Sequence, residues 1–160
     1  MRSTPANLNL RRRIFMTIKT TINFARVVSG GCIAGIILFI GSGIVNGAIL
    51  NSEFEQWAHE MGNLIHPLPQ STSLLLWGLM CLMHGIVGVW IYAGIRPRYG
   101  AGPKTALLAG LLLWIVSKLA VALDLFALGI LPNNILVGQL IESFVAILLG
   151  VFLGALFYKE

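Results

Sequence analysis

Six polar side chains interrupt the long apolar runs of this sequence, and their types are those that can do chemistry inside a membrane. They are Asn46, His84, Lys118, Asp124, Gln139 and Glu142. A charge at the centre of a bilayer costs at least about 2.5 kcal/mol, so such residues are seldom kept without a partner or a task. An acid near a base in this setting can exchange a proton or form a buried ion pair.

The positions of these residues predict that they share one layer of the protein. At about 1.5 Å per residue, Lys118 and Glu142 lie at similar depths on consecutive antiparallel spans, so we expect an ion pair between them. Asp124 lies about 120° from Lys118 around the same helix, so we expect it to bond to Gln139 or Asn46, or to be protonated. The cluster is either a proton-linked site or a network that fixes helix register.

His84 has a chemical alternative of its own, because a lone intramembrane histidine can ligate haem or the magnesium of chlorophyll. The apolar runs hold no second histidine that would complete a bis-histidine haem site. We therefore expect His84 to hydrogen-bond to a neighbouring helix, and we expect neither a cofactor nor a metal. The motifs HExxH and GxSxG, a Walker loop and a CxxC pair are all absent from the sequence, which favours a noncatalytic protein.

The elements that must position these residues are four apolar runs, each long enough to cross a hydrocarbon layer of roughly 30 Å. They are Val27–Leu50, Ser73–Ile95, Ala106–Leu131 and Ile135–Tyr158. The composition agrees, since 57% of residues are hydrophobic and only 11% are charged. Because lipid offers no hydrogen-bond partners, the backbone groups of each span must pair within the protein. The sequence therefore predicts an all-α, polytopic membrane protein built as a bundle of four transmembrane helices.

The basic residues predict the orientation of this bundle. They flank the spans on one side, at Arg2, Arg11, Arg12, Arg13, Lys19 and Arg26, then at Arg96, Arg98 and Lys104, and finally at Lys159. The positive-inside rule places these regions and both termini in the cytoplasm. We expect a basic cytoplasmic lead over residues 1–22, starting at Met1 or Met16, before a transmembrane domain over residues 23–160. The net charge of +5 then indicates membrane lipids as partners, rather than nucleic acid.

The loop after the first span has the pattern of a short amphipathic helix. Ser52 and Glu55 have the spacing of a capping box, and apolar residues then recur at helical spacing around Trp57. The pair His66-Pro67 ends the pattern. We predict a periplasmic interfacial helix over residues 53–65, with Trp57 against lipid or the rim of the bundle.

Small residues predict where the spans approach one another. Gly31 and Gly35 form a small-xxx-small pair in the first span, and Gly85 belongs to a seam of small residues in the second. In the fourth span, Gly138, Glu142, Ala146, Gly150 and Gly154 recur every four residues. Cys32 and Cys81 lie at different depths, so we expect no disulfide between them.

The segment between the second and third spans reads IRPRYGAGPKTA over residues 95–106. It predicts a tight cytoplasmic turn in which Pro97 ends one helix, Gly100 and Gly102 allow the reversal, and Pro103 starts the next helix. Its basic side chains, Arg96, Arg98 and Lys104, have the charge to bind phospholipid phosphates.

This loop, together with Asn46-Gly47 near the end of the first span, resembles small uncharacterised bacterial four-helix membrane proteins over about residues 24–158. The resemblance implies a multi-pass protein of the bacterial inner membrane, in a family without an assigned activity. We expect a structural or accessory role, as a subunit of a larger assembly or as a homo-oligomer. The alternative is a small proton-linked transporter or channel that uses Lys118, Glu142 and Asp124. A polar cavity reaching Glu142 from water would favour transport, and a dry, fully paired network would favour the structural role.

Overall fold

The computed structural model describes residues 22–158, all of whose regular elements are helices. Four helical segments are long and apolar enough to cross a membrane, namely Phe24–Ile49, Gln70–Tyr99, Pro103–Leu128 and Asn133–Phe157. The prediction of an all-α chain with four spans is therefore confirmed. The predicted basic lead, apart from Ile22, lies outside the described residues.

The first span changes its helical form before it ends. Helix α2 (Phe24–Ile44) begins where the Asn23 side chain accepts a hydrogen bond from the Arg26 backbone N–H at 3.3 Å. A π-helical turn, η1 (Val45–Ile49), follows without interruption and leads into α3 (Asn51–Met61) and a short 3-10 turn, η2 (Gly62–Leu64). The first span and the outer helix are thus one nearly continuous helical path.

The longest helix, α4 (Gln70–Tyr99), corrects the prediction that Pro97 ends it. Pro97 lies inside the last turn, where its missing N–H removes a single ladder bond that the helix can lose. The helix ends at Gly100, whose φ of 84° is open to glycine and whose N–H bonds to the Arg96 carbonyl at 2.8 Å. Pro103 occupies the first turn of the next helix, as predicted.

The third span is also interrupted by a π-helical turn. It consists of α5 (Pro103–Trp114), η3 (Ile115–Leu119) and α6 (Ala120–Leu128), and it ends at Gly129 in the left-handed conformation. Helix α7 (Asn133–Phe157) returns beside it as the fourth span. Between α4 and α5, the Thr105 hydroxyl donates to the Gly100 carbonyl at 2.8 Å and closes the turn.

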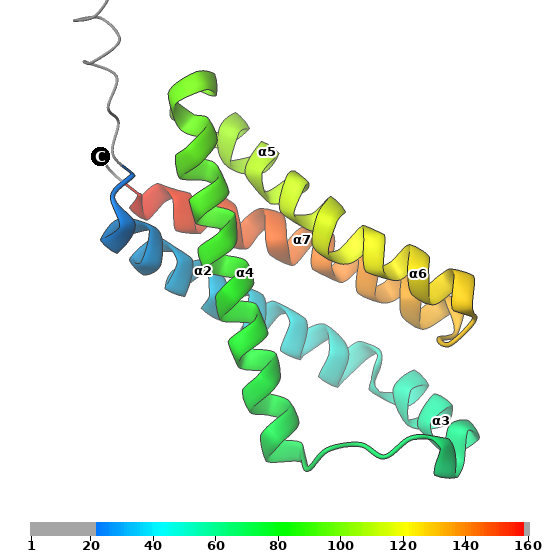
Figure 1. Ribbon diagram of the computed structural model, residues 1–160. Helices are drawn as coiled ribbons and strands as arrows, with labels where there is room; N and C mark the ends of the chain where they lie inside the picture. The colour runs from blue at the N-terminus through cyan, green and yellow to red at the C-terminus, as the bar shows by residue number, and fades with distance from the viewer. Residues whose placement is uncertain (1–21, 159–160) are drawn as a thin grey trace, which may run out of the picture.

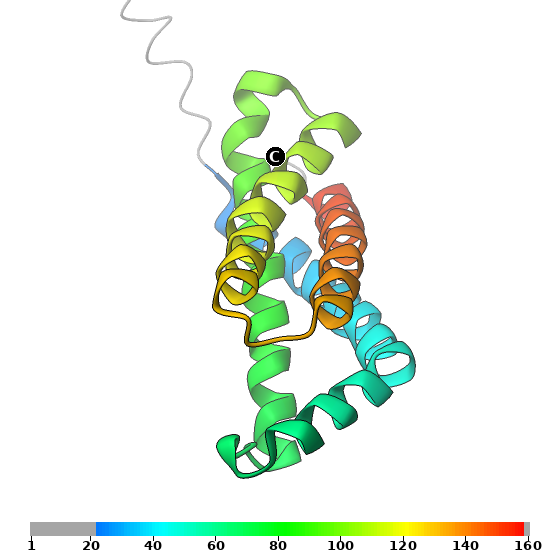
Figure 2. The same cartoon turned by 90° about the vertical axis from the view of Figure 1, so that its right-hand side faces the viewer.

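Helix α4 crosses the other spans steeply, whereas α6 and α7 run side by side (Figures 1 and 2). Below the crossing in Figure 1, α4 diverges from α6, and α3 lies near the same end of the molecule. The core lies where α2, α4 and α7 meet, and the side chains of Val27, Val89 and Val151 there are fully buried.

Glycines permit the close contacts at this crossing. A Cβ atom added at Gly31 would lie 2.5 Å from the Cα of Ile86, and one added at Gly35 would lie 2.8 Å from the Cα of Leu82. On the other side of α2, a Cβ at Gly30 or at Gly154 would lie 2.6 Å from the carbonyl oxygen of the other residue. The predicted role of small residues in helix packing is confirmed at these positions.

Helix α3 differs in its start from the predicted helix over residues 53–65. It begins at Asn51, whose side chain donates to Glu55 at 2.8 Å, so the expected capping box of Ser52 and Glu55 is wrong. The physical reason is that the chain enters α3 from η1 with Leu50 already in a helical conformation, and backbone carbonyls bond the first N–H groups. Phe54 and Trp57 are half-buried.

The crossing of α2 and α4 predicts a sharp difference between two glycines of α4. The Gly85→Ala substitution should lower the free energy of unfolding by about 1–3 kcal/mol, because its Cβ would meet the backbone of Gly31 and Gly35. Gly94→Ala is the matched control, since nothing lies within 4 Å of its Cβ position. Unfolding measured in mixed micelles should separate the two variants, and equal stabilities would contradict the packing.

Candidate functional site

A cavity of about 680 Å³ lies on the side where α4 diverges from α6. Five of the six polar residues singled out in the sequence line it, namely Asn46, His84, Lys118, Gln139 and Glu142. These residues come from η1, α4, η3 and α7, so the fold brings together groups that lie far apart in the sequence. The cavity is the candidate functional site.

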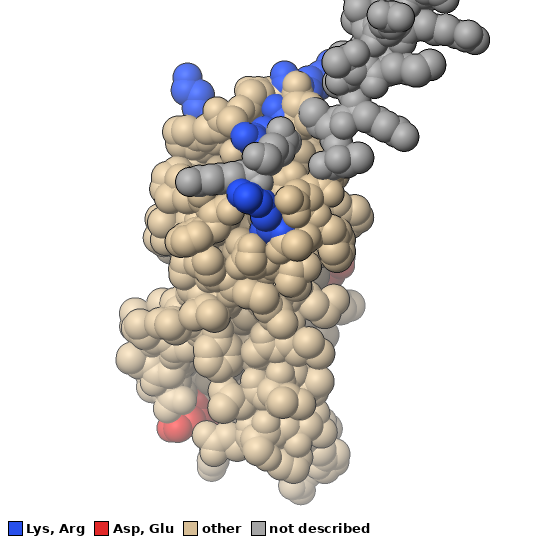
Figure 3. Space-filling view, turned by 90° about the vertical axis from the view of Figure 1, so that its left-hand side faces the viewer, with Lys and Arg blue, Asp and Glu red and all other residues tan. Residues whose placement is uncertain are grey.

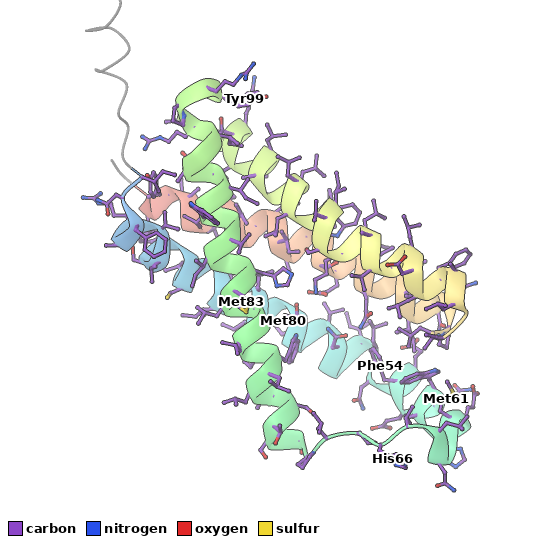
Figure 4. The ribbon with its side chains drawn as sticks, viewed as in Figure 1. Phe54, Met61, His66, Met80, Met83 and Tyr99 are labelled. Carbon is purple, nitrogen blue, oxygen red and sulfur yellow. The ribbon has the colours of Figure 1, made fainter. Side chains whose placement is uncertain are left out.

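The cavity extends from one end of the spans toward their middle. Gln70, the first residue of α4, lines it, and so does His84, which lies 14 residues further along the helix, since 84 − 70 = 14. This separation corresponds to about 21 Å along the helix axis. Phe54 of α3 lines the cavity near its outer end, and Met80 of α4 lines it deeper in (Figure 4).

Glu142 is held by a serine of another span. Its Oε1 atom accepts a hydrogen bond from the Ser42 hydroxyl at 2.5 Å, which joins α7 to α2. The charge of Lys118 acts on this carboxyl, but neither a hydrogen bond nor an ion pair joins the two residues in the described part of the chain. The predicted Lys118–Glu142 ion pair is therefore replaced by a Ser42–Glu142 hydrogen bond with Lys118 at longer range.

Lys118 owes its position to the π-helical turn η3. This turn changes the register of the third span, and the neighbouring Ser117 hydroxyl bonds back to the Leu113 carbonyl at 2.7 Å. Among the described residues, the Lys118 ammonium has neither a hydrogen bond nor an ion pair. Its three N–H donors are thus available to the cavity that it lines.

His84 bonds within its own helix. Its Nδ1 atom lies 2.8 Å from the Met80 carbonyl oxygen, which can only accept, so Nδ1 carries the proton in this contact. The expected bond to a neighbouring helix is therefore wrong, because the carbonyl one turn earlier on α4 is closer. This bond leaves Nε2 as the ring nitrogen available to a ligand.

Asp124 does not join the cluster. It is exposed on α6 and is not among the residues that line the cavity, so the expected bond to Gln139 or Asn46 is wrong. The Asn46 amide instead donates to the Ser42 carbonyl of its own helical path at 2.9 Å. The six-residue separation from Lys118 places Asp124 on a different side of the third span.

Several polar residues of the cavity were missed by the sequence analysis, and most of them are serines. Ser117 and Ser143 line the cavity, each directly beside a charged residue of the predicted cluster. Ser143 is buried, accepts a hydrogen bond from the Trp114 indole at 3.2 Å and donates to the Leu140 carbonyl at 3.2 Å. Their adjacency to Lys118 and Glu142 is the signal that identifies them in the sequence.

A small recess of about 20 Å³ continues the cavity inward, and the residues that border it include Ser42, Cys81, His84 and Lys118. This volume is enough for about one water molecule. Leu38 and Ile147 border the recess as well, and the fully buried core of Val89 and Val151 lies among the same helices. The cavity is thus closed on the side of the core.

A hydrogen bond holds helix α3 beside the open end of the cavity. The Trp57 indole donates to the Ile130 carbonyl, between α6 and α7, at 3.2 Å. Glu53 is half-buried, and one of its carboxylate oxygens is buried without a hydrogen-bond partner. Trp57 therefore contacts the rim of the bundle, one of the two placements expected for it.

Apart from Lys118, the Lys and Arg residues that the structure describes lie at the opposite end of the molecule (Figure 3). The Arg96 guanidinium lies 5.6 Å from the centre of the Tyr158 ring, and the Tyr158 hydroxyl accepts a hydrogen bond from the Asn23 N–H at 3.3 Å. Arg98 and Lys104 are exposed. Headgroup binding by Arg96, Arg98 and Lys104 remains a prediction, and Arg96 also joins the ends of α4 and α7.

Among residues 22–158, no three His, Cys, Asp or Glu side chains lie close enough to hold a metal ion. Comparison of the chain with models of known protein families, with curated proteins and with solved structures found no match. The resemblance of the loop over residues 95–106 to small bacterial membrane proteins therefore stays a prediction.

Two positions of α7 test whether the cavity is open to water. In a variant with Cys32 and Cys81 replaced by alanine, Gln139→Cys should react with a charged, membrane-impermeant thiol reagent, because Gln139 lines the cavity. Ile141→Cys should not react, since Ile141 is exposed on the apolar surface of the same helix, where lipid excludes the reagent. Equal labelling at the two positions would show that Gln139 does not face water.

Proposed function

We propose that this chain is a small proton-linked transporter whose binding site is the cavity between α4, α6 and α7. The observation that carries the proposal is a cavity that extends from the outer end of α4 to Glu142 and Lys118. Intramembrane ionisable residues that line a water-filled cavity commonly mark proton and substrate pathways. A fully paired, dry network would have supported the structural role instead.

The two charged residues have complementary parts in this proposal. Glu142 is the proton carrier, held in place by the Ser42 hydroxyl at 2.5 Å. Lys118 supplies the opposite charge and has no other described partner to occupy its ammonium. His84 lines the cavity and the recess, and its available nitrogen can pass protons between them.

The π-helical turns supply the deformable elements that transport requires. Both η1 and η3 contain cavity residues, Asn46 in the first and Ser117 and Lys118 in the second. Turns of this kind occur often at functional sites, because their extra residue can shift along the helix. Helix α2 stays fixed to α4 through the glycine contacts, so we infer that η1 and η3 absorb the movement.

A second proposal concerns assembly. Asp124 is an exposed acid on a candidate span, one turn before α6 ends at Leu128. Polar groups on spans usually face protein rather than lipid. This supports a homo-oligomer or a larger membrane assembly, and an accessory, noncatalytic role remains the alternative function.

The membrane and the orientation are also proposed. The sequence resemblance supports the bacterial inner membrane, and the positive-inside rule supports cytoplasmic termini. Arg98 and Lys104 are exposed between α4 and α5, while the acids Glu55 and Glu60 are exposed on α3. This supports a periplasmic position for the open end of the cavity and an interfacial one for α3.

The proton-carrying role of Glu142 can be read by infrared spectroscopy of the protein in lipid. A carboxyl band should respond to pH and to exchange into heavy water, because the cavity connects Glu142 to the outer solvent. The band should be absent in Glu142→Gln and present in Glu60→Gln, since Glu60 is exposed on α3. Identical spectra of the wild type and Glu142→Gln at every pH would contradict the role.

The orientation is tested by single cysteines in the variant without Cys32 and Cys81. Ser52→Cys and Asn133→Cys should react with an impermeant reagent added to intact cells, because both positions lie at the proposed periplasmic end. Gly100→Cys should react only after the membrane is opened. Labelling of Gly100→Cys in intact cells would reverse the proposed topology.

A further inference from the structure

We propose that the ligand of the cavity is a single-chain amphiphile with an anionic head group, which enters from the outer leaflet between α4 and α6 and binds Lys118. This inference rests on the proposed function, because it names the substrate class of the same site. Three features of the cavity support it, namely its distribution of polar groups, its open side and the unoccupied ammonium.

The ionisable groups gather at the inner end of the cavity. His84, Lys118 and Glu142 lie there, beside the small recess. The walls between this end and the opening are uncharged and carry several apolar side chains beside Asn46, Gln70, Ser73 and Gln139, namely Leu74, Trp77, Val121, Leu125 and Leu136. A polar end with an apolar wall matches a ligand that has a polar head and a hydrocarbon tail, and the volume is that of a site for one small molecule.

The open side faces lipid. Leu74 on α4 is 52% exposed and Val121 on α6 is 50% exposed, although both line the cavity. Both residues lie within candidate spans, in the halves nearer the open end of the cavity, on the two helices that diverge in Figure 1. A ligand can therefore enter sideways from the hydrocarbon layer with its tail against Leu74 and Val121.

Lys118 selects the charge of the head group. Its ammonium has no hydrogen-bond partner among the described residues, whereas Glu142 already accepts a bond from Ser42. An anion on Lys118 can thus gain up to three charged hydrogen bonds without breaking one. A cation at Glu142 would have to share a carboxylate that is already engaged.

Charge balance couples this ligand to a proton. In the empty cavity the charges of Lys118 and Glu142 offset each other, so an added anion leaves one negative charge in excess. A proton from the outer water, bound by the Glu142 carboxylate, restores neutrality. The other titratable groups that border the site are His84 and Cys81 of α4, while α2 contributes Ser42 and α6 contributes only apolar side chains.

Quenching of Trp77 fluorescence tests the proposal, because Trp77 lines the cavity. The full chain is reconstituted in nanodiscs of a zwitterionic lipid and titrated with a brominated alkyl sulfonate, which stays anionic at every pH used. Matched probes are the brominated alcohol and the brominated trimethylammonium of equal chain length. A saturable component of quenching should appear with the sulfonate, disappear in Trp77→Phe and persist in Trp90→Phe, whose side chain is exposed on the same helix.

Two further variants separate the charges. Lys118→Met should weaken sulfonate binding by about tenfold or more, because it removes the charged donor of the hydrogen bonds to the head group, and Lys118→Arg should retain most of the affinity. Binding by the wild type should tighten as the pH falls. Glu142→Gln should bind the sulfonate and lose this pH dependence, whereas His59→Gln, at an exposed histidine of α3 outside the cavity, should keep it.

The outcomes distinguish the two proposals. Absence of a saturable component at Trp77, stronger binding of the cationic probe, or an equal effect from a brominated two-chain anionic lipid would each overturn the proposed ligand. Loss of sulfonate binding in Glu142→Gln would overturn the charge-balance argument. None of these results contradicts the proposed transporter itself, which fails only if the Glu142 carboxyl does not exchange protons with the outer solvent.

Discussion

The close contact of α4 with α2 is the constraint on which the rest of the structure depends. Gly31 and Gly85 remove the side chains that would otherwise hold the two backbones apart. Because α4 crosses steeply at this point, its outer half cannot remain beside α6, and the cavity forms between them. The same contact keeps the core tightly packed around Val89 and Val151, so the cavity is closed on the side of the core.

This arrangement explains how charged residues persist inside the spans. A direct pair of Lys118 and Glu142 would have removed both groups from further chemistry. Instead, Ser42 supports the carboxylate through a hydrogen bond, and Lys118 shares only the electrostatic field of the same cavity. A polar cavity lowers the cost of each charge, and both side chains keep atoms available for a ligand or a proton.

The spans, the close glycine contacts and the gathering of polar residues followed from the sequence, because each depends on hydrophobicity, side-chain size or depth along a helix. The partners of Lys118 and Asp124 could not be predicted from the sequence, because they depend on the direction in which each side chain points around its helix axis. The π-helical turn over Ile115–Leu119 alters that rotation around Lys118, and the residue types of this turn do not predict a π-helix. The predictions that Pro97 ends α4 and that a capping box starts α3 were wrong for a related reason. Gly100 determines the end of α4, and the continuous helical path through Leu50 determines the start of α3.

The proposed transport depends most on water reaching the middle of the spans through this cavity. Spin labels at Ala122→Cys and Leu123→Cys test this directly, because Ala122 lines the cavity and its neighbour Leu123 is exposed on the apolar surface of α6. Electron spin echo modulation in heavy water should show deuterium close to the label at position 122 and little at position 123. Equally weak deuterium modulation at the two positions would mean a dry interior and would contradict the account.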